Sequence, residues 1–211
     1  MSLPNAGRNI RALARSRRFD ALLYFIFAVG VAAAPFMIAT VLKLKLPSLV
    51  LYLGLPMAAF ALLSARKQWQ RADQADQGAQ GEEDVERLLQ KLPPEWITEF
   101  NHPMRRVGDI DIIVRSPRGR VWAIDVKSHR GTVRVQDGEL YRKVAGQDRS
   151  FEKNFLTAVK KQAVLLRESQ ELRYVQPVIC FSHAVCFLPE KVQGVQVVSA
   201  DQLVNYLLSE G

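Results

Sequence analysis

The sequence is poor in cysteine and histidine, and it lacks several short motifs that mark common catalytic sites. Its 211 residues include two cysteines and three histidines. Cys180 and Cys186 suggest neither a disulfide framework nor a metal knuckle and fit small buried residues in a reducing cytoplasm. His102, His129 and His183 lack the spacing of metal ligands. No Gly-x-Gly-x-x-Gly loop, Walker A loop or Gly-x-Ser-x-Gly elbow is present, which argues against the corresponding nucleotide-binding and hydrolase sites.

Charged residues are absent from two long runs near the N-terminus. Residues 21–42 and 46–65 are uncharged runs of 22 and 20 residues, and Lys43 and Lys45 lie between them. A membrane-spanning helix needs about 20 apolar residues. We therefore predict a two-helix transmembrane hairpin over residues 21–65, with the lipid bilayer as a partner. A cleaved signal peptide and a soluble, buried helical hairpin are the alternatives.

The net charge of +8 is concentrated in the same region. Residues 1–65 contain seven Lys/Arg and one acidic residue, and residues 66–211 contain the other 22 basic and 20 acidic residues. The first part therefore carries +6 and the second +2, which is weak evidence for nucleic-acid binding by the second part. Basic residues flank both ends of the hairpin, and the positive-inside bias places residues 1–20 and the C-terminal part in the cytoplasm.

The rest of the chain is predicted to form a linker, residues 66–77, which is either irregular or a helical continuation of the hairpin, and one α/β domain, residues 78–211. Helical spacing of apolar residues follows Gly78 and ends at Pro93-Pro94. Strands are expected at residues 96–100, 132–135, 139–143, 177–181 and 195–198, and helices at 151–172 and 201–208. This order predicts a mixed β-sheet flanked by helices on both sides.

The segment from Gly108 to Lys127, GDIDIIVRSPRGRVWAIDVK, is predicted to be a β-hairpin. A three-residue loop, 117–119, gives antiparallel partners whose numbers sum to 236, so that Asp111 lies opposite Asp125 and Asp109 opposite Lys127. The same register places Ile110, Ile112, Val114, Trp122, Ile124 and Val126 on one apolar face. Two carboxylates about 5 Å apart repel each other unless a positive charge lies between them. A divalent cation with Lys127 beside it is one interpretation, and a solvated ion pair on an exposed strand end is the other.

These elements together resemble the PD-(D/E)xK nuclease superfamily and, within it, the nuclease-related domain family, which is often attached to bacterial membrane segments. The residues that carry the resemblance are Gly78-x-x-Gly81-Glu82, Leu92-Pro93, Gly108-Asp109-Ile110-Asp111, Asp125-Val126-Lys127 and Gly131. It covers roughly residues 78–180. It implies a restriction-endonuclease-like α/β fold, a bacterial-type inner membrane location and Mg²⁺ or Mn²⁺ as cofactor.

The resemblance also implies a role for each matching position. Asp111 and Asp125 would be metal ligands, Lys127 would position and help deprotonate the attacking water, and Glu82 would complete the metal site. Glu83 and Glu86 are rivals to Glu82, because the phase of the helix is unknown. Gln162 could be the amide found on the following helix, although the segment around Asn154 lacks the Asn-Pro-x-x-Gln pattern of the family.

The implied function is hydrolysis of phosphodiester bonds in nucleic acid, with DNA favoured over RNA and a homodimer as one expected state. Two alternatives remain open: a catalytically idle nucleic-acid-binding module on the same fold, and a membrane-associated interaction protein. Arginines that surround the hairpin in sequence either contact a nucleic-acid backbone or are scattered over the surface. These are Arg105, Arg106, Arg115, Arg118, Arg120, Arg130 and Arg134.

Overall fold

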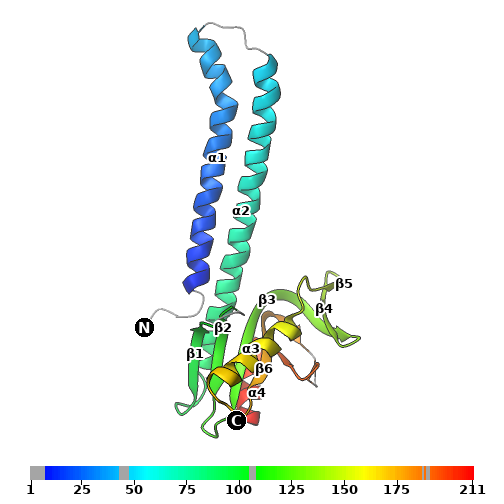
Figure 1. Cartoon of the computed structure of the whole chain (residues 1–211). Helices are drawn as coiled ribbons and strands as arrows, with labels where there is room; N and C mark the ends of the chain where they lie inside the picture. Colours follow the sequence, from blue (N-terminus) through cyan, green and yellow to red (C-terminus); the bar gives the residue numbers. More distant parts are fainter. Residues whose placement is uncertain (1–7, 43–47, 105–107, 187, 189–190) are drawn as a thin grey trace. The chain divides into compact units, whose positions relative to one another are not determined.

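The computed structural model describes residues 8–42, 48–104, 108–186, 188 and 191–211 (Figure 1). By its internal contacts the chain divides into a helical unit, residues 9–77, and a second unit that comprises residues 78–211. We call the second one the α/β unit. Each unit is described by itself.

The helical unit consists of helix α1 (Arg8–Leu42) and the first part of helix α2 (Ser48–Leu89). Alanines are buried at seven-residue intervals on α1, and alanines are also buried at intervals of three, four and seven residues on α2. They are Ala14, Ala21 and Ala28 on α1, and Ala58, Ala61, Ala65 and Ala72 on α2. Such small side chains allow two helices to approach closely. Arg18 adds an ion pair to Asp76, with Nη2 2.5 Å from Oδ2.

The outer surface of the helical unit is rich in large apolar side chains. The exposed ones include Phe19, Leu22, Phe25, Ile26, Phe27, Leu55, Met57, Phe60 and Leu63. In the part of the chain that the structure describes, no helix meets both the length and the apolarity needed to cross a membrane. A helical hairpin is thus present, but its prediction as a transmembrane hairpin is not supported. Lys43 and Lys45, its predicted connection, lie outside the described residues.

Residues 66–77, predicted as a linker or a helical continuation, are helical. Helix α2 continues through residues 66–77 and ends at Leu89, so the helix that was expected to open at Gly78 begins much earlier. The segment is polar but contains no proline, and neither Gly78 nor Gly81 interrupts the helix. One or two glycines cost a helix about 1 kcal/mol each, which is too little to end it.

The α/β unit is built on a seven-stranded mixed sheet. Its strands are β1 (Ile97–His102), β2 (Ile110–Arg115), β3 (Val121–Gln136), β4 (Glu139–Val144), β5 (Gln147–Ser150), β6 (Gln176–Cys186) and β7 (Gln196–Ser199). Strands β1 to β5 follow one another in antiparallel pairs, whereas β6 is parallel to β3 and β7 is parallel to β6. The prediction of a mixed sheet is confirmed.

Helices cover both faces of this sheet, as expected. On one face, Val85 and Leu89 of α2 and Leu203 and Leu207 of α4 (Ala200–Glu210) form a core with strand residues that include Trp122. On the other face lies α3 (Phe155–Ser169), shown in yellow in Figure 1, whose buried residues pack on β2, β3 and β6. Helix α3 is shorter than the predicted 151–172, and strand β5 was not predicted.

The β2–β3 hairpin has the predicted register. Ile112 pairs with Ile124 and Arg115 with Val121, so partner numbers sum to 236. The backbone N–H of Gly119 donates to the carbonyl of Ser116, and Gly119 has φ +80°, as the three-residue loop requires. Ile110 is the exception to the predicted faces, because it packs in the core on the α3 side. Ile110 precedes Ile112, the first residue of β2 that pairs with β3. The alternation of side chains in the β2–β3 pair therefore does not determine which face of the sheet Ile110 occupies.

Candidate active site

Two carboxylates and an ammonium group meet on the adjacent strands β2 and β3. The pair Ile112–Ile124 begins the ladder, and continuing its register by one residue places Asp111 opposite Asp125. Asp111 Oδ2 accepts a hydrogen bond from the backbone N–H of Val126, with a distance of 2.7 Å. Lys127 Nζ lies 2.6 Å from Asp125 Oδ2. The structure therefore brings these three predicted residues together.

Burial makes this group of charges electrostatically unusual. Asp125 is only 7% exposed. Burial, followed by the charge of Asp125, raises the pKa of Asp111 to about 8. Burial also raises the pKa of Asp125, although the ammonium of Lys127 opposes this increase. Two carboxylates that share one buried position cannot both ionise without a compensating positive charge. A further positive charge beside the pair would therefore favour its ionised form.

Helix α2 contributes a third carboxylate. Glu82, Glu83 and Glu86 are all buried, but only Glu82 is among the groups whose charge raises the pKa of Asp111. Glu82 is therefore the acidic residue of α2 whose charge acts on Asp111, and its role in a metal site stays a prediction. Its neighbour Gly81 shows how the helix comes so close to the sheet. A Cβ atom on Gly81 would lie 2.4 Å from Ser182 Oγ and 3.1 Å from Ser128 Cβ.

Gln162 lies on the buried side of α3 and is linked to the same region through the backbone. Its Nε2 donates to the carbonyl oxygen of Asp109 at 3.1 Å, two residues before Asp111. Its buried Oε1 has no hydrogen-bond partner among the residues that the structure describes. Gln162 therefore supports the chain that leads into Asp111. The side chain of Asp109, which was expected opposite Lys127, is exposed.

The donor chemistry of this site suits a hard divalent cation. Carboxylate oxygens are the preferred ligands of Mg²⁺. A positive ion beside Asp111 and Asp125 would offset the burial that raises both pKa values and the charge of Asp125 that further raises the pKa of Asp111. Within the described residues, no group of three or more His, Cys, Asp or Glu is arranged to hold a metal ion. The chain thus offers two adjacent carboxylates and, from α2, the charge of Glu82. Metal binding by these residues stays a prediction.

An aromatic cluster beside Lys127 was not predicted. It consists of His129, Phe151, Phe155 and Phe181. Lys127 Nζ lies 5.1 Å from the centre of the Phe155 ring, and the rings of His129 and Phe151 stack with centroids 5.2 Å apart. The cluster joins β3, β6 and the start of α3, so no local pattern in the sequence reveals it. The Phe155 ring of this cluster lies against the Lys127 ammonium on one side.

Of the arginines that are close in sequence to the hairpin, those that the structure describes belong to different parts of the α/β unit. Arg105 and Arg106 lie outside the described residues. Arg115 Nη2 donates to Gln170 Oε1 at 2.6 Å, and Arg118 and Arg120 lie at the β2–β3 turn. Arg130 and Arg134 are exposed on the second half of β3. Contact of these arginines with a nucleic-acid backbone stays a prediction.

Comparison with known proteins agrees with the elements that form this site. Residues 77–182, which are 106 of the 211 residues, match the family described as NERD, nuclease-related domain. This range contains Glu82, Asp111, Asp125, Lys127 and Gln162. No curated protein and no solved structure is matched. The matched range covers half of the chain, and the chain therefore belongs to the nuclease-related domain family.

Proposed function

We propose that this protein is a metal-dependent nuclease that hydrolyses phosphodiester bonds of nucleic acid, with DNA preferred over RNA. The observation that carries the proposal is the pairing of half-buried Asp111 with buried Asp125, with Lys127 Nζ 2.6 Å from Asp125 Oδ2. Phosphodiester hydrolysis requires neutralisation of phosphate charge and a water molecule that is activated as a nucleophile. Membership in the nuclease-related domain family supports the same reaction class.

Each residue has a proposed role in that reaction. Asp111 and Asp125 would hold Mg²⁺ or Mn²⁺, and Glu82 would add negative charge on the side of α2. The ion, when bound, supplies Lewis-acid activation of the phosphate and lowers the pKa of a coordinated water. Lys127 would position the attacking water and stabilise the negative charge that develops as the P–O bond breaks. Gln162 would hold the backbone before Asp111 in place.

The test is a cleavage assay with the full chain. Labelled single- and double-stranded DNA and RNA are incubated with Mg²⁺, Mn²⁺ or EDTA, and the Asp125→Asn and Lys127→Ala variants are compared with the original chain. Asp148→Asn and Lys161→Ala serve as matched controls, because both side chains are exposed and lie outside the site. We expect cleavage that requires a metal, is reduced by at least about 100-fold in the two site variants, and is retained in the controls.

Two outcomes would contradict this proposal. Cleavage that persists in EDTA or in both site variants would mean that another site, or a contaminant, is responsible. Salt-sensitive binding of nucleic acid without cleavage on any substrate would favour the idle binding module instead. Circular dichroism of each variant shows whether it is folded, so that loss of cleavage is interpreted only for folded variants.

We also propose that the helical unit attaches the α/β unit to a lipid bilayer, with the α/β unit in the cytoplasm of a bacterial-type cell. The support is the set of exposed large apolar side chains on α1 and α2, which include Phe25, Ile26, Phe60 and Leu63. Exposed apolar surface of this extent is typical of membrane or protein contact sites. Flotation of the full chain with phospholipid vesicles tests attachment, and carbonate extraction separates insertion from surface binding. Recovery at the bottom of the gradient would refute attachment.

A homodimer is the remaining prediction about assembly. Cleavage of both strands of a duplex needs two active sites, or one site that acts twice. Light scattering of the full chain, alone and with duplex DNA, distinguishes these arrangements. A monomer under both conditions would refute the dimer without affecting the proposed chemistry.

A further inference from the structure

Apart from the candidate active site, a polar pocket lies at the end of the β2–β3 hairpin that carries the turn. It has a volume of about 480 Å³, which is within the range of roughly 300–1,000 Å³ that is common for small-molecule sites. The turn, the chain before and at the start of β6, the segment before β7 and the end of α4 all line it. The lining residues that matter here are Arg118, Arg120, Arg173, Tyr174, Lys191 and Glu210.

The pocket carries an excess of positive charge. Four of its side chains are cationic and one, Glu210, is acidic. Arg120 Nη1 lies 2.8 Å from Glu210 Oε2, so this pair is already matched. Arg118 and Arg173 make no hydrogen bond or ion pair with any residue that the structure describes. Guanidinium groups with free donors are well suited to bind phosphate oxygens in a bidentate manner.

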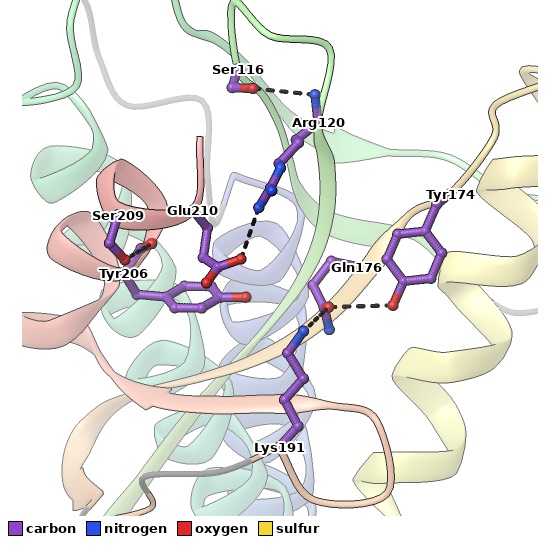
Figure 2. A network of polar contacts seen from close by, with 8 residues as sticks. All are labelled: Ser116, Arg120, Tyr174, Gln176, Lys191, Tyr206, Ser209 and Glu210. Atoms are coloured by element: carbon purple, nitrogen blue, oxygen red, sulfur yellow. Dashed lines mark hydrogen bonds and ion pairs between the residues drawn. The ribbon is translucent and has the colours of Figure 1, made fainter.

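A hydrogen-bond network orients the other wall of the pocket. Gln176 is buried, and its Oε1 accepts from Lys191 Nζ at 2.6 Å and from the hydroxyl of Tyr174 at 3.3 Å (Figure 2). Its Nε2 donates to the carbonyl oxygens of Pro177 and Gly194. Both ends of the amide are therefore used, which fixes Gln176 as a support. Tyr174 remains 61% exposed and presents a large aromatic surface next to the cations.

We propose that this pocket binds a nucleoside phosphate, either as a free nucleotide or as the 5′-phosphorylated end of a strand. The phosphate would lie on Arg118 and Arg173, with Lys191 nearby, and the base would stack on Tyr174. Aromatic rings next to cations are a recurrent combination for nucleotide units. Val121 lines the pocket and is four residues from Asp125 along β3, a separation of about 13 Å at 3.3 Å per residue. The pocket is therefore separate from the candidate active site, and the proposal does not depend on nuclease activity.

Isothermal titration calorimetry on the full chain tests this proposal. The probes are AMP, ribose 5-phosphate, adenosine, and one oligonucleotide with and without a 5′-phosphate. EDTA is present throughout, so that metal-assisted binding at Asp111 and Asp125 is suppressed. The Arg118→Ala/Arg173→Ala double variant removes two cations that make no hydrogen bond or ion pair with the described residues. Arg134→Ala/Lys161→Ala is the charge-matched control, because both of its side chains are exposed and far along the chain from the turn.

We expect AMP and ribose 5-phosphate to bind and adenosine not to bind. The affinity for AMP should fall at least about tenfold in the double variant and stay within about twofold in the control. Tyr174→Leu should lower the affinity for AMP by about fivefold or more and leave the affinity for ribose 5-phosphate unchanged. Tyr174→Phe, which keeps the aromatic ring, should retain AMP binding. Binding of the 5′-phosphorylated oligonucleotide in preference to the unphosphorylated one would identify a strand end as a source, and binding of AMP alone would identify a free nucleotide.

Three results would overturn the proposal. They are the absence of binding for every phosphorylated probe, equal binding of adenosine and AMP, and unchanged affinity in the Arg118→Ala/Arg173→Ala variant. None of them bears on the cleavage assay, which uses metal and different residues. The calorimetry and the cleavage assay therefore show separately whether the pocket binds a nucleoside phosphate and whether the chain is a nuclease.

Discussion

Two glycines on helix α2 provide a sharp test of how the candidate active site is assembled. A Cβ atom at Gly78 would meet no described atom within 4 Å, whereas one at Gly81 would lie 2.4 Å from Ser182 Oγ, 3.1 Å from Ser128 Cβ and 3.3 Å from Ser182 Cβ. Ser182 Oγ is 2.8 Å from His183 Nδ1, so rotating it away breaks a hydrogen bond. The two Cβ atoms move only with their strands.

The magnitudes of the two effects follow from this difference. Replacing a glycine inside a helix by alanine stabilises the helix by about 1 kcal/mol, and this gain applies to both positions. Overpacking of a tight contact costs about 1–3 kcal/mol, and this cost applies only to Gly81. We therefore expect Gly78→Ala to be stabilising by about 1 kcal/mol, and Gly81→Ala to range from neutral to destabilising by about 2 kcal/mol.

Urea denaturation of the full chain measures this difference. A Trp69→Phe background is used, because the remaining Trp96 and Trp122 both belong to the α/β unit, where their rings stack. Gly81→Ala is then combined with Ser182→Ala, which removes the nearest atom and should recover part of the loss. Equal stabilisation by Gly78→Ala and Gly81→Ala would refute the close approach of α2 to the sheet.

Three other predictions concern charge, capping and thiol reactivity. The pKa of Asp111 is about 8 in the folded protein, whereas 3.8 is the ordinary value for an unperturbed aspartate. Between these pH values the folded protein therefore binds one more proton than the unfolded protein. The free energy of unfolding in EDTA should fall by up to about 1.4 kcal/mol per pH unit as pH rises from 5 to 8. Asp111→Asn should flatten that slope, and a stability that rises with pH would contradict it. Asn154 caps α3 by accepting from the backbone N–H of Thr157 at 2.9 Å, and Asn154→Ala should cost about 1 kcal/mol in urea denaturation. Burial raises the pKa of the thiols of Cys180 and Cys186, the latter to about 12, so neither should react with a disulfide reagent at pH 8 until the protein is unfolded.

The parts of the fold that local patterns determine could be predicted well. Alternation of apolar residues and a three-residue loop ending in Gly119 were enough to fix the β2–β3 register, and with it the approach of Asp111 to Asp125. The Asp137-Gly138 turn fixed the β3–β4 hairpin in the same way. In both cases the partners are close in sequence, so few alternative pairings compete.

The features that the sequence did not reveal depend on tertiary contacts. The polar segment 66–77 fitted either a linker or a helical continuation, and α2 continues through it. The aromatic cluster around Lys127 brings together His129, Phe155 and Phe181 from three separate elements, and no spacing rule connects them. The prediction of a transmembrane hairpin rests on the absence of charge in two runs, and the helices in the described part of the chain do not support it.

The choice among Glu82, Glu83 and Glu86 shows why helix phase has to come from packing. All three are buried, so burial alone does not distinguish them. Gly81 lies close to Ser128 of β3 and Ser182 of β6, and the charge of the next residue, Glu82, raises the pKa of Asp111. A shift of α2 would change the field of Glu82 while leaving the Asp111–Asp125 register intact, because that register belongs to the hairpin. Gly81→Ala should therefore lower the pKa of Asp111 as Glu82 moves away, and NMR titration of the side-chain carboxyl carbons in EDTA would detect the change. An unchanged pKa in a variant that is measurably destabilised would separate the packing role of Gly81 from any influence on the site.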